Sequence, residues 1–336
     1  MTSTPSVSWR DRVRVSVTAT RTRMRSAVAG ALDAVARESS DLRPATASRA
    51  IPALTPLDRA RFGSTALLLV GSILLGFAAY LVIASPVTFL RDQALLREEL
   101  RFELANSTAP VSQFESTGEL LTPGQPVALL EIDAIDLSTV IVEGTDARAL
   151  QSGPGHRRDT VMPGQVGASV IFGRQAAFGG PFSRLSELDE GDRIVVTTGQ
   201  GRFVFTVAGV RTGQEALPDR PASDSTLTLV TATGIPYFAE DVLRVDAVLA
   251  GNAAEAGARA FGYSALPRDE LAMASRFSTG SEVAIWALLL LAAVAAMPVM
   301  RRAWGRWQAW AVGVPTTVFL GFLLFRDLST LLPNLT

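Results

Sequence analysis

The chain has 336 residues, of which 48% are apolar, with a mean hydropathy of +0.27 and a net charge of −1. It is too apolar for an ordinary soluble protein, and its charge balance argues against general attraction to nucleic acid. It contains no cysteine and one histidine, which excludes disulfides, a thiolate nucleophile, cysteine-ligated metals and multi-histidine metal sites. We therefore expect a membrane protein with no cofactor and no bound metal.

Residues 1–62 carry eleven Arg against five acidic residues and are rich in Ser, Thr and Ala. This composition predicts an Arg-rich disordered cytoplasmic arm. The clustered Arg side chains suit binding to anionic lipid or nucleic acid, but we favour the simpler interpretation that they determine membrane topology.

Three apolar segments are long enough to cross a bilayer, at 63–90, 283–300 and 307–325, since a span needs about 20 residues. The loop between the second and third (residues 301–306) is rich in Arg and bordered by Trp. Short Arg-rich loops stay on the cytoplasmic side. The sequence thus predicts a multi-pass protein of the cell membrane, with residues 91–282 and a short tail at 326–336 outside.

The outer region changes character along its length. Residues 91–104 have apolar residues at helical spacing, and we expect an extracytoplasmic helix and linker over 91–123. From 124 to 251 the pattern is one of short β-type runs between turn residues, including a hairpin over 194–210. Many short strands with few helices indicate an all-β barrel or sandwich. Residues 252–282 are interpreted as a linker to the second span.

Several ordered segments of this region resemble the sortase family of bacterial cell-surface transpeptidases, in particular its actinobacterial class E-like members. They are PVALLEIDAIDLSTVIVEGT (126–145), ALQSGPGH (149–156), MPGQVGASVIFGRQAAFGGPFSRLSEL (162–188), GDRIVV (191–196) and TLTLVTAT (226–233). The resemblance implies a closed β-barrel of about eight strands, anchored outside the membrane beside three transmembrane helices.

The resemblance also implies a chemistry that needs a Cys nucleophile, a His for proton transfer and an Arg near the oxyanion. Ala232 stands at the Cys position and Arg174 at the His position. Val242 matches the Arg position without gaps, whereas Arg244 follows two residues later. Alanine has no nucleophilic atom, and Arg cannot act as a base near neutral pH. No catalytic residue is therefore expected.

Other residues are poor substitutes for the missing nucleophile and base. Thr231 or Thr233 would need a general base, and His156 lies in a loop that does not supply the catalytic His in the resembling family, so we expect it to be structural. Four loop carboxylates are interpreted as solvated turn residues rather than calcium ligands: Asp159, Glu187, Asp189 and Asp192.

We therefore predict a degenerate, catalytically inactive pseudoenzyme that binds or scaffolds a peptide or protein partner at the outer face of the membrane, in envelope or surface-protein assembly. Arg174, Thr231 and Arg244 are the candidate groove-binding residues. Two alternatives stay open. One is an active transpeptidase or acyl transferase with unorthodox residues, and the other is an assembly factor that acts mainly through its transmembrane helices.

Overall fold

A computed structural model describes residues 56–115, 117–213 and 224–336. Most of the predicted Arg-rich arm falls outside these residues. The chain divides into two compact units, Met1–Ala66 and Leu67–Thr336. Helix α2 (Pro56–Ala79) begins before the expected start of the first span at residue 63. Proline suits the first helical turn, where its missing N–H costs no hydrogen bond.

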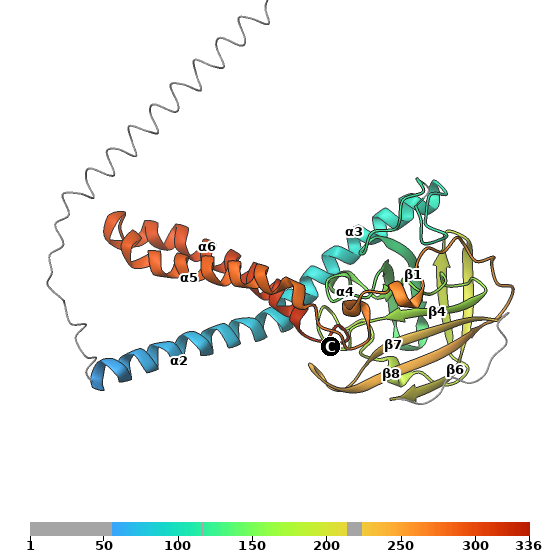
Figure 1. Cartoon of the computed structure of the whole chain (residues 1–336), viewed down its shortest axis with the longest axis horizontal. Coiled ribbons are helices and arrows are strands. Elements are labelled where there is room, and N and C mark those ends of the chain that lie inside the picture. The colour runs from blue at the N-terminus through green and yellow to red at the C-terminus, as the bar shows by residue number, and fades with distance from the viewer. Residues whose placement is uncertain (1–55, 116, 214–223) are drawn as a thin grey trace, which may run out of the picture. The chain divides into compact units, whose positions relative to one another are not determined.

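Three helical segments have the length and composition to cross a membrane: Val70–Ala105, Phe277–Ala303 and Arg306–Leu331. The first of them runs from α2 through a π-helical turn, η1 (Tyr80–Ala84), into α3 (Ser85–Ala105). The other two contain α5 (Gly280–Ala303) and α6 (Arg306–Leu328). These segments agree with the three spans predicted from sequence (Figure 1).

Eight strands close into a barrel in the order β1-β2-β3-β4-β7-β8-β6-β5, which confirms the expected fold. The strands are β1 (Pro126–Ile132), β2 (Leu137–Glu143), β3 (Gly155–His156), β4 (Gly167–Phe172), β5 (Arg193–Thr198), β6 (Gly201–Thr212), β7 (Ser225–Ile235) and β8 (Phe238–Leu249). The short helix α4 (Ala149–Ser152) lies in the loop between β2 and β3. The predicted hairpin corresponds to β5 and β6.

Strand β7 lies between β4, to which it is parallel, and β8, to which it is antiparallel. Successive side chains of a strand point to opposite faces. Leu227 and Leu229 of β7 therefore join the main core inside the barrel, whereas Val230 and Ala232 join a separate apolar cluster on the outer face. This outer face of β4, β7 and β8 carries the candidate site.

Helix α3, the extracytoplasmic helix expected from the sequence, packs on the barrel. Leu96 and Leu100 lie in one buried cluster with Val140 and Val142 of β2. The Gln93 carboxamide accepts from the Val140 N–H at 2.7 Å and donates to the Val140 carbonyl at 3.0 Å. The apolar stripe of this amphipathic helix is thus buried against β2.

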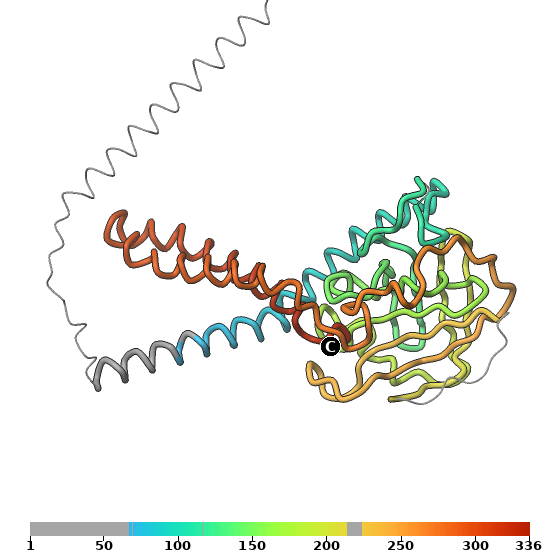
Figure 2. Tube along the Cα trace, viewed as in Figure 1, coloured from blue at the N-terminus to red at the C-terminus, as the bar shows by residue number. Residues whose placement is uncertain are grey.

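The segment 252–282 differs from the expected linker, because it packs over the barrel. The Thr145 hydroxyl donates to the Glu270 carbonyl at 2.6 Å, and the buried Glu270 carboxylate pairs with Arg158 at 3.1 Å. Burial raises the pKa of Glu270, and the charge of Arg158 partly offsets the rise. In the chain trace, residues after the barrel return across it before entering α5 (Figure 2).

The packing of α3 against the barrel can be tested by mutation. Leu100 is 2% exposed and Phe102 is 70% exposed on the same helix. Leu100→Ala should lower the free energy of unfolding of the barrel by about 2–4 kcal/mol, because it leaves a cavity in a packed interface. Phe102→Ala, the matched control, should change it by less than about 0.5 kcal/mol. Chemical denaturation of the full chain in detergent measures both, and equal effects would contradict the docked position of α3.

Candidate functional site

A cavity of about 240 Å³ opens on the outer face of β4, β7 and β8. Its walls combine apolar strand residues with three Arg side chains and part of the segment that follows β8. The lining residues are Arg157, Val170, Phe172, Arg211, Thr228, Val230, Arg244, Tyr263, Leu271 and Ala272. Phe172 and Val230 also belong to the outer apolar cluster and Ala272 packs against it, so the cavity and the cluster adjoin. We refer to the two together as the groove.

Ala232 lies at the filled end of this groove. It is opposite Val242 in the β7–β8 pairing and only 2% exposed. Its cluster contains Leu150, Phe172, Val230, Val242 and Leu335. Leu335 belongs to the C-terminal tail (residues 330–336). This tail is the last part of the short outer tail predicted at 326–336, and in the structure it packs against the barrel.

Arg174 follows β4 and is fully buried. Its guanidinium donates to three backbone oxygens: Nη2 to Ala147 at 2.8 Å, Nη1 to Thr336 at 3.0 Å and Nε to Leu150 at 3.1 Å. It also lies 5.1 Å from the ring centroid of Phe178. Burial lowers the pKa of Arg174 to about 10, so the group stays cationic at neutral pH. Arg174 ties a loop to the tail and does not line the open cavity.

Arg244 does line the cavity. It pairs with Val230 across the β7–β8 ladder, two residues beyond Val242, and therefore shares a strand face with it. Its guanidinium donates to the Gly213 carbonyl. Burial lowers the pKa of Arg244, and the nearby charge of Arg211 lowers it further. Arg211 itself is in an ion pair with Asp246.

Thr231 requires a correction, because it does not face the groove. It alternates with Val230 and Ala232 and so lies on the interior face of β7. It is 1% exposed, and its hydroxyl makes no hydrogen bond within the part of the chain that the structure describes. From the sequence, side chains of β7 are expected to alternate between two faces. Which of the two faces lies inside the barrel depends on the neighbouring strands.

His156 is buried in the barrel wall, with both ring nitrogens occupied. Nδ1 lies 2.8 Å from a carboxylate oxygen of Glu143, and Nε2 lies 2.9 Å from the Val161 carbonyl oxygen. Burial alone would lower the pKa of His156, but the charge and hydrogen bond of Glu143 outweigh burial and raise it. Both partners accept hydrogen bonds, so the geometry favours the doubly protonated ring, which has no lone pair to act as a base.

The four loop carboxylates do not converge. Asp159 forms an ion pair with Arg157 and Glu187 forms one with Arg184, while an Asp192 carboxylate oxygen accepts from the Asp189 N–H at 2.9 Å. Over residues 56–115, 117–213 and 224–336, no three acidic or His side chains gather as metal ligands.

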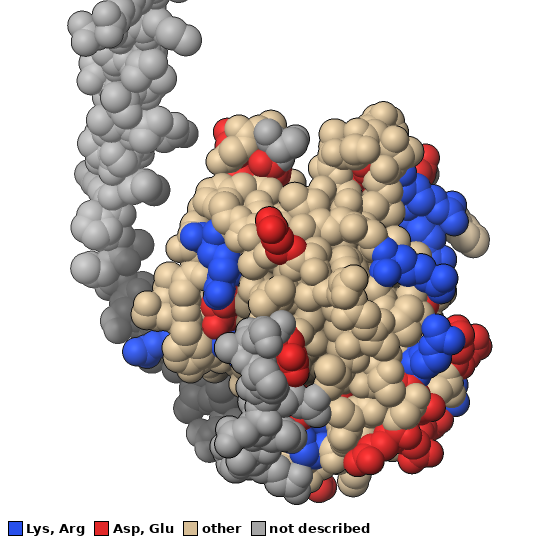
Figure 3. All heavy atoms as spheres, turned by 90° about the vertical axis from the view of Figure 1, so that its right-hand side faces the viewer, with Lys and Arg blue, Asp and Glu red and all other residues tan. Residues whose placement is uncertain are grey.

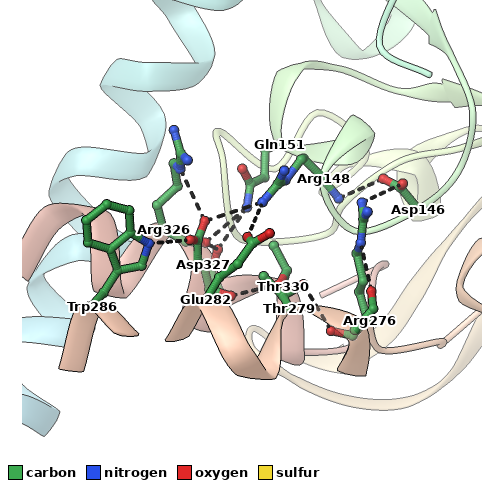
Figure 4. Close-up of polar contacts among 12 residues, drawn as sticks. Asp146, Arg148, Gln151, Arg276, Thr279, Glu282, Trp286, Arg326, Asp327 and Thr330 are labelled. Carbon is green, nitrogen blue, oxygen red and sulfur yellow. Dashed lines mark hydrogen bonds and ion pairs between the residues drawn. The ribbon is translucent and has the colours of Figure 1, made fainter. Parts of the chain in front are cut away.

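A polar network joins the loop between β2 and β3 to the ends of α5 and α6 (Figure 4). The buried carboxylate of Asp327 accepts from the Trp286 indole N–H at 2.9 Å and lies 3.6 Å from the Arg148 guanidinium. Arg148 also pairs with Glu282 at 3.0 Å, and Gln151 donates to the Ser329 hydroxyl at 3.0 Å. Sequence reasoning missed this network, since its members are far apart along the chain.

Residues 130–248 match the family model of the sortase domain. This part of the chain is similar to sortases. It is 36% identical over 84 residues to Sortase D of Bacillus subtilis (strain 168), covering 25% of this chain and 41% of that protein. It is 35% identical over 95 residues to Sortase SrtE1 of Streptomyces coelicolor, covering 26% of this chain and 27% of that protein. The chain thus spans less than half the length of either relative.

Solved sortase structures are also similar to part of this chain. A Clostridium perfringens Sortase D5 transpeptidase matches with 25% identity and a TM-score of 0.41, covering 48% of this chain and 99% of that chain. Sortase E from Streptomyces avermitilis matches with 26% identity and a TM-score of 0.35, covering 39% of this chain and 91% of that chain. The residues that match the family model, 130–248, include β4, Arg174, and β7 with Ala232.

The His156–Glu143 pair predicts a pH dependence of stability. Because the pKa of His156 is raised in the folded protein, its contribution is complete below the unfolded value of about 6.5 and is lost as pH rises through the folded value. The free energy of unfolding should therefore fall as pH rises above about 6.5, with a slope that His156→Gln reduces. Denaturant titrations of the full chain test this, and a wild-type stability that is flat or rises over that range would contradict it.

Proposed function

We propose that this protein is a catalytically inactive, sortase-like membrane protein that binds a peptide or protein partner through the groove on β4, β7 and β8, in envelope or surface-protein assembly. One observation carries the proposal: the positions that match the family's Cys and His hold Ala232 and Arg174, and both side chains are buried in structural contacts. A partner-binding role needs the groove and not the nucleophile.

The unorthodox-enzyme alternative has less support. The sequence has no cysteine, and Thr231 faces the barrel interior, where no base reaches its hydroxyl among the described residues. The one histidine has both nitrogens in hydrogen bonds. A hydroxyl nucleophile without an adjacent base is a poor attacking group.

The open part of the groove suits an extended segment. Val170, Phe172 and Val230 give it an apolar floor, and Arg244 adds a positive charge whose hydrogen bond goes to a backbone carbonyl. This combination favours a peptide with an apolar side chain next to an acidic or carboxylate group. On the face of the barrel drawn in Figure 3, basic and acidic side chains are interspersed around neutral residues, which agrees with a protein partner better than with nucleic acid.

The proposed location is the outer side of the cell membrane. Arg148, in the loop after β2, contacts both Glu282 at the start of α5 and Asp327 near the end of α6. The barrel therefore adjoins one end of this helical hairpin, and the Arg-rich turn that includes Arg301 and Arg302 lies at the other end. A cytoplasmic turn would leave the barrel outside.

Affinity purification from native membranes tests the groove. Arg244→Glu should reduce recovery of co-purifying partner at least about tenfold, because it reverses the charge at the cavity wall. Arg184→Glu is the matched control, since Arg184 is half exposed and pairs with Glu187 away from the cavity lining.

Thermal unfolding of both variants checks that the barrel remains folded. Undiminished recovery with Arg244→Glu would contradict the groove as the binding surface. It would favour the helices instead, since α5 has no buried residue and so offers its side chains to lipid or to another protein.

A second experiment addresses catalysis. The purified full chain is incubated with an amine nucleophile and peptides that carry a sorting signal, the sequence that the resembling family cleaves. Mass spectrometry should detect no transpeptidation product. Product formation that Thr231→Ala abolishes would establish the unorthodox enzyme and overturn the proposed function. The conservative variant Thr231→Ser, which keeps the hydroxyl, should then retain that activity.

A further inference from the structure

The C-terminal tail (residues 330–336) is more deeply buried than a segment emerging from a membrane-spanning helix needs to be. Thr330, Asn334 and Leu335 are each 0% exposed, and Thr336 is 1% exposed. The tail follows α6 and begins within the short helix η7 (Ser329–Leu331). Figures 1 and 2 show this end of the chain returning to the barrel.

The backbone of the tail is held from two sides. The Gln175 N–H, just after β4, donates to the Leu335 carbonyl at 2.9 Å. On the other side, the Asn334 N–H donates to the Ala274 carbonyl at 2.9 Å, and the Arg276 N–H donates to the Thr330 carbonyl at 3.0 Å. Backbone hydrogen bonds of this kind are how proteins bind extended peptides.

The side chains of the tail are recognised individually. The Asn334 carboxamide donates to the carbonyls of Thr145 at 2.8 Å and Leu271 at 2.9 Å. Leu335 fills the apolar pocket that contains Ala232 and Val242. The next backbone oxygen, that of Thr336, accepts from Arg174 at 3.0 Å. The tail thus offers an amide, an aliphatic side chain and an oxygen to three different subsites.

We propose that residues 330–336 are a tethered ligand of the groove: they occupy a peptide-binding site formed by Arg174, Ala232 and Gln175, and a partner segment binds there only by displacing them. This inference rests on the proposed function, because it concerns the filled end of the same groove. The competing ligand is an extended segment that places an aliphatic side chain beside Ala232 and an oxygen within reach of Arg174.

The buried charge makes the oxygen necessary. Arg174 donates hydrogen bonds to the backbone oxygens of Ala147 and Leu150, and a third to the backbone oxygen of Thr336 in the tail. When the tail leaves, the Arg174 Nη1 group loses this hydrogen-bond acceptor, which is costly for a buried cation. A displacing peptide therefore has to replace the Thr336 oxygen with a carbonyl or carboxylate. The tether also gives the tail a high effective concentration, so an untethered copy should compete poorly with it.

Cross-linking tests the position of the tail independently of any partner. The chain has no cysteine, so the paired variant Ala232→Cys with Leu335→Cys carries two thiols only. Mild oxidation with copper phenanthroline, which takes two electrons from the pair, should form an intramolecular disulfide in most molecules. The matched control is Ile235→Cys with Leu335→Cys, because Ile235 is on the same strand but 65% exposed. Equal cross-linking in the two pairs would overturn the proposal.

Displacement is tested with a fluorescent peptide of sequence TLLPNLT, the sequence of residues 330–336. Full-length Leu335→Asp, whose charged side chain does not fit the apolar pocket, should bind this peptide at least tenfold more tightly than the wild type does. A peptide with Asp in place of the Leu that corresponds to Leu335 should bind neither the wild type nor the variant. Asn334→Ala is a milder variant that should show the same trend, and thermal unfolding checks that each variant is folded.

The outcomes separate this inference from the proposed function. Equal peptide binding by wild type and both variants, together with efficient cross-linking, would make the tail a fixed structural plug and overturn displacement. If the variants bind the peptide more tightly but neither they nor the wild type recover a partner from membranes, the proposed function fails and the tethered ligand stands.

Discussion

The buried guanidinium of Arg174 is the interaction on which the site depends. A cation without exposed surface must be surrounded by acceptors, since leaving a buried charge unpartnered costs several kcal/mol. The acceptors are backbone oxygens from the loop after β2 and from the C-terminal tail. The loop after β2, the end of β4 and the C-terminal tail therefore lie together around this guanidinium. In the structure Arg174 connects these segments through hydrogen bonds.

The alanine at residue 232 belongs to the same arrangement. Its small side chain forms part of an apolar pocket that accepts Leu335, and Val242 opposite it adds to that pocket. A polar Arg at residue 242 would not fit such surroundings without a partner. The side chains at residues 174, 232 and 242 thus belong to one packed and hydrogen-bonded arrangement, which supports the proposed binding role.

The sequence was informative where local patterns determine structure. Alternating β-type runs predicted the barrel, and uncharged apolar runs predicted the three spans. The missed features depend on long-range contacts. Arg174 and Thr336 are 162 residues apart, and the segment LLPNLT has no strand or helix period that would reveal its burial. The helical spacing of Leu96 and Leu100 indicated an apolar face on α3, but not that β2 would cover it. Likewise, two-residue alternation fixed that Thr231 and Ala232 face opposite ways, and only the barrel decided which one faces the groove.

The polar network around Asp327 has a mechanical consequence. The barrel is joined to the apolar helices through α3, through the Arg148–Glu282 pair and through the Gln151–Ser329 contact. A domain hung from one flexible stalk can swing and search a wide volume, whereas one held at three points cannot. If the groove binds a partner as proposed, these three attachments would limit it to segments presented at a set distance from the apolar helices.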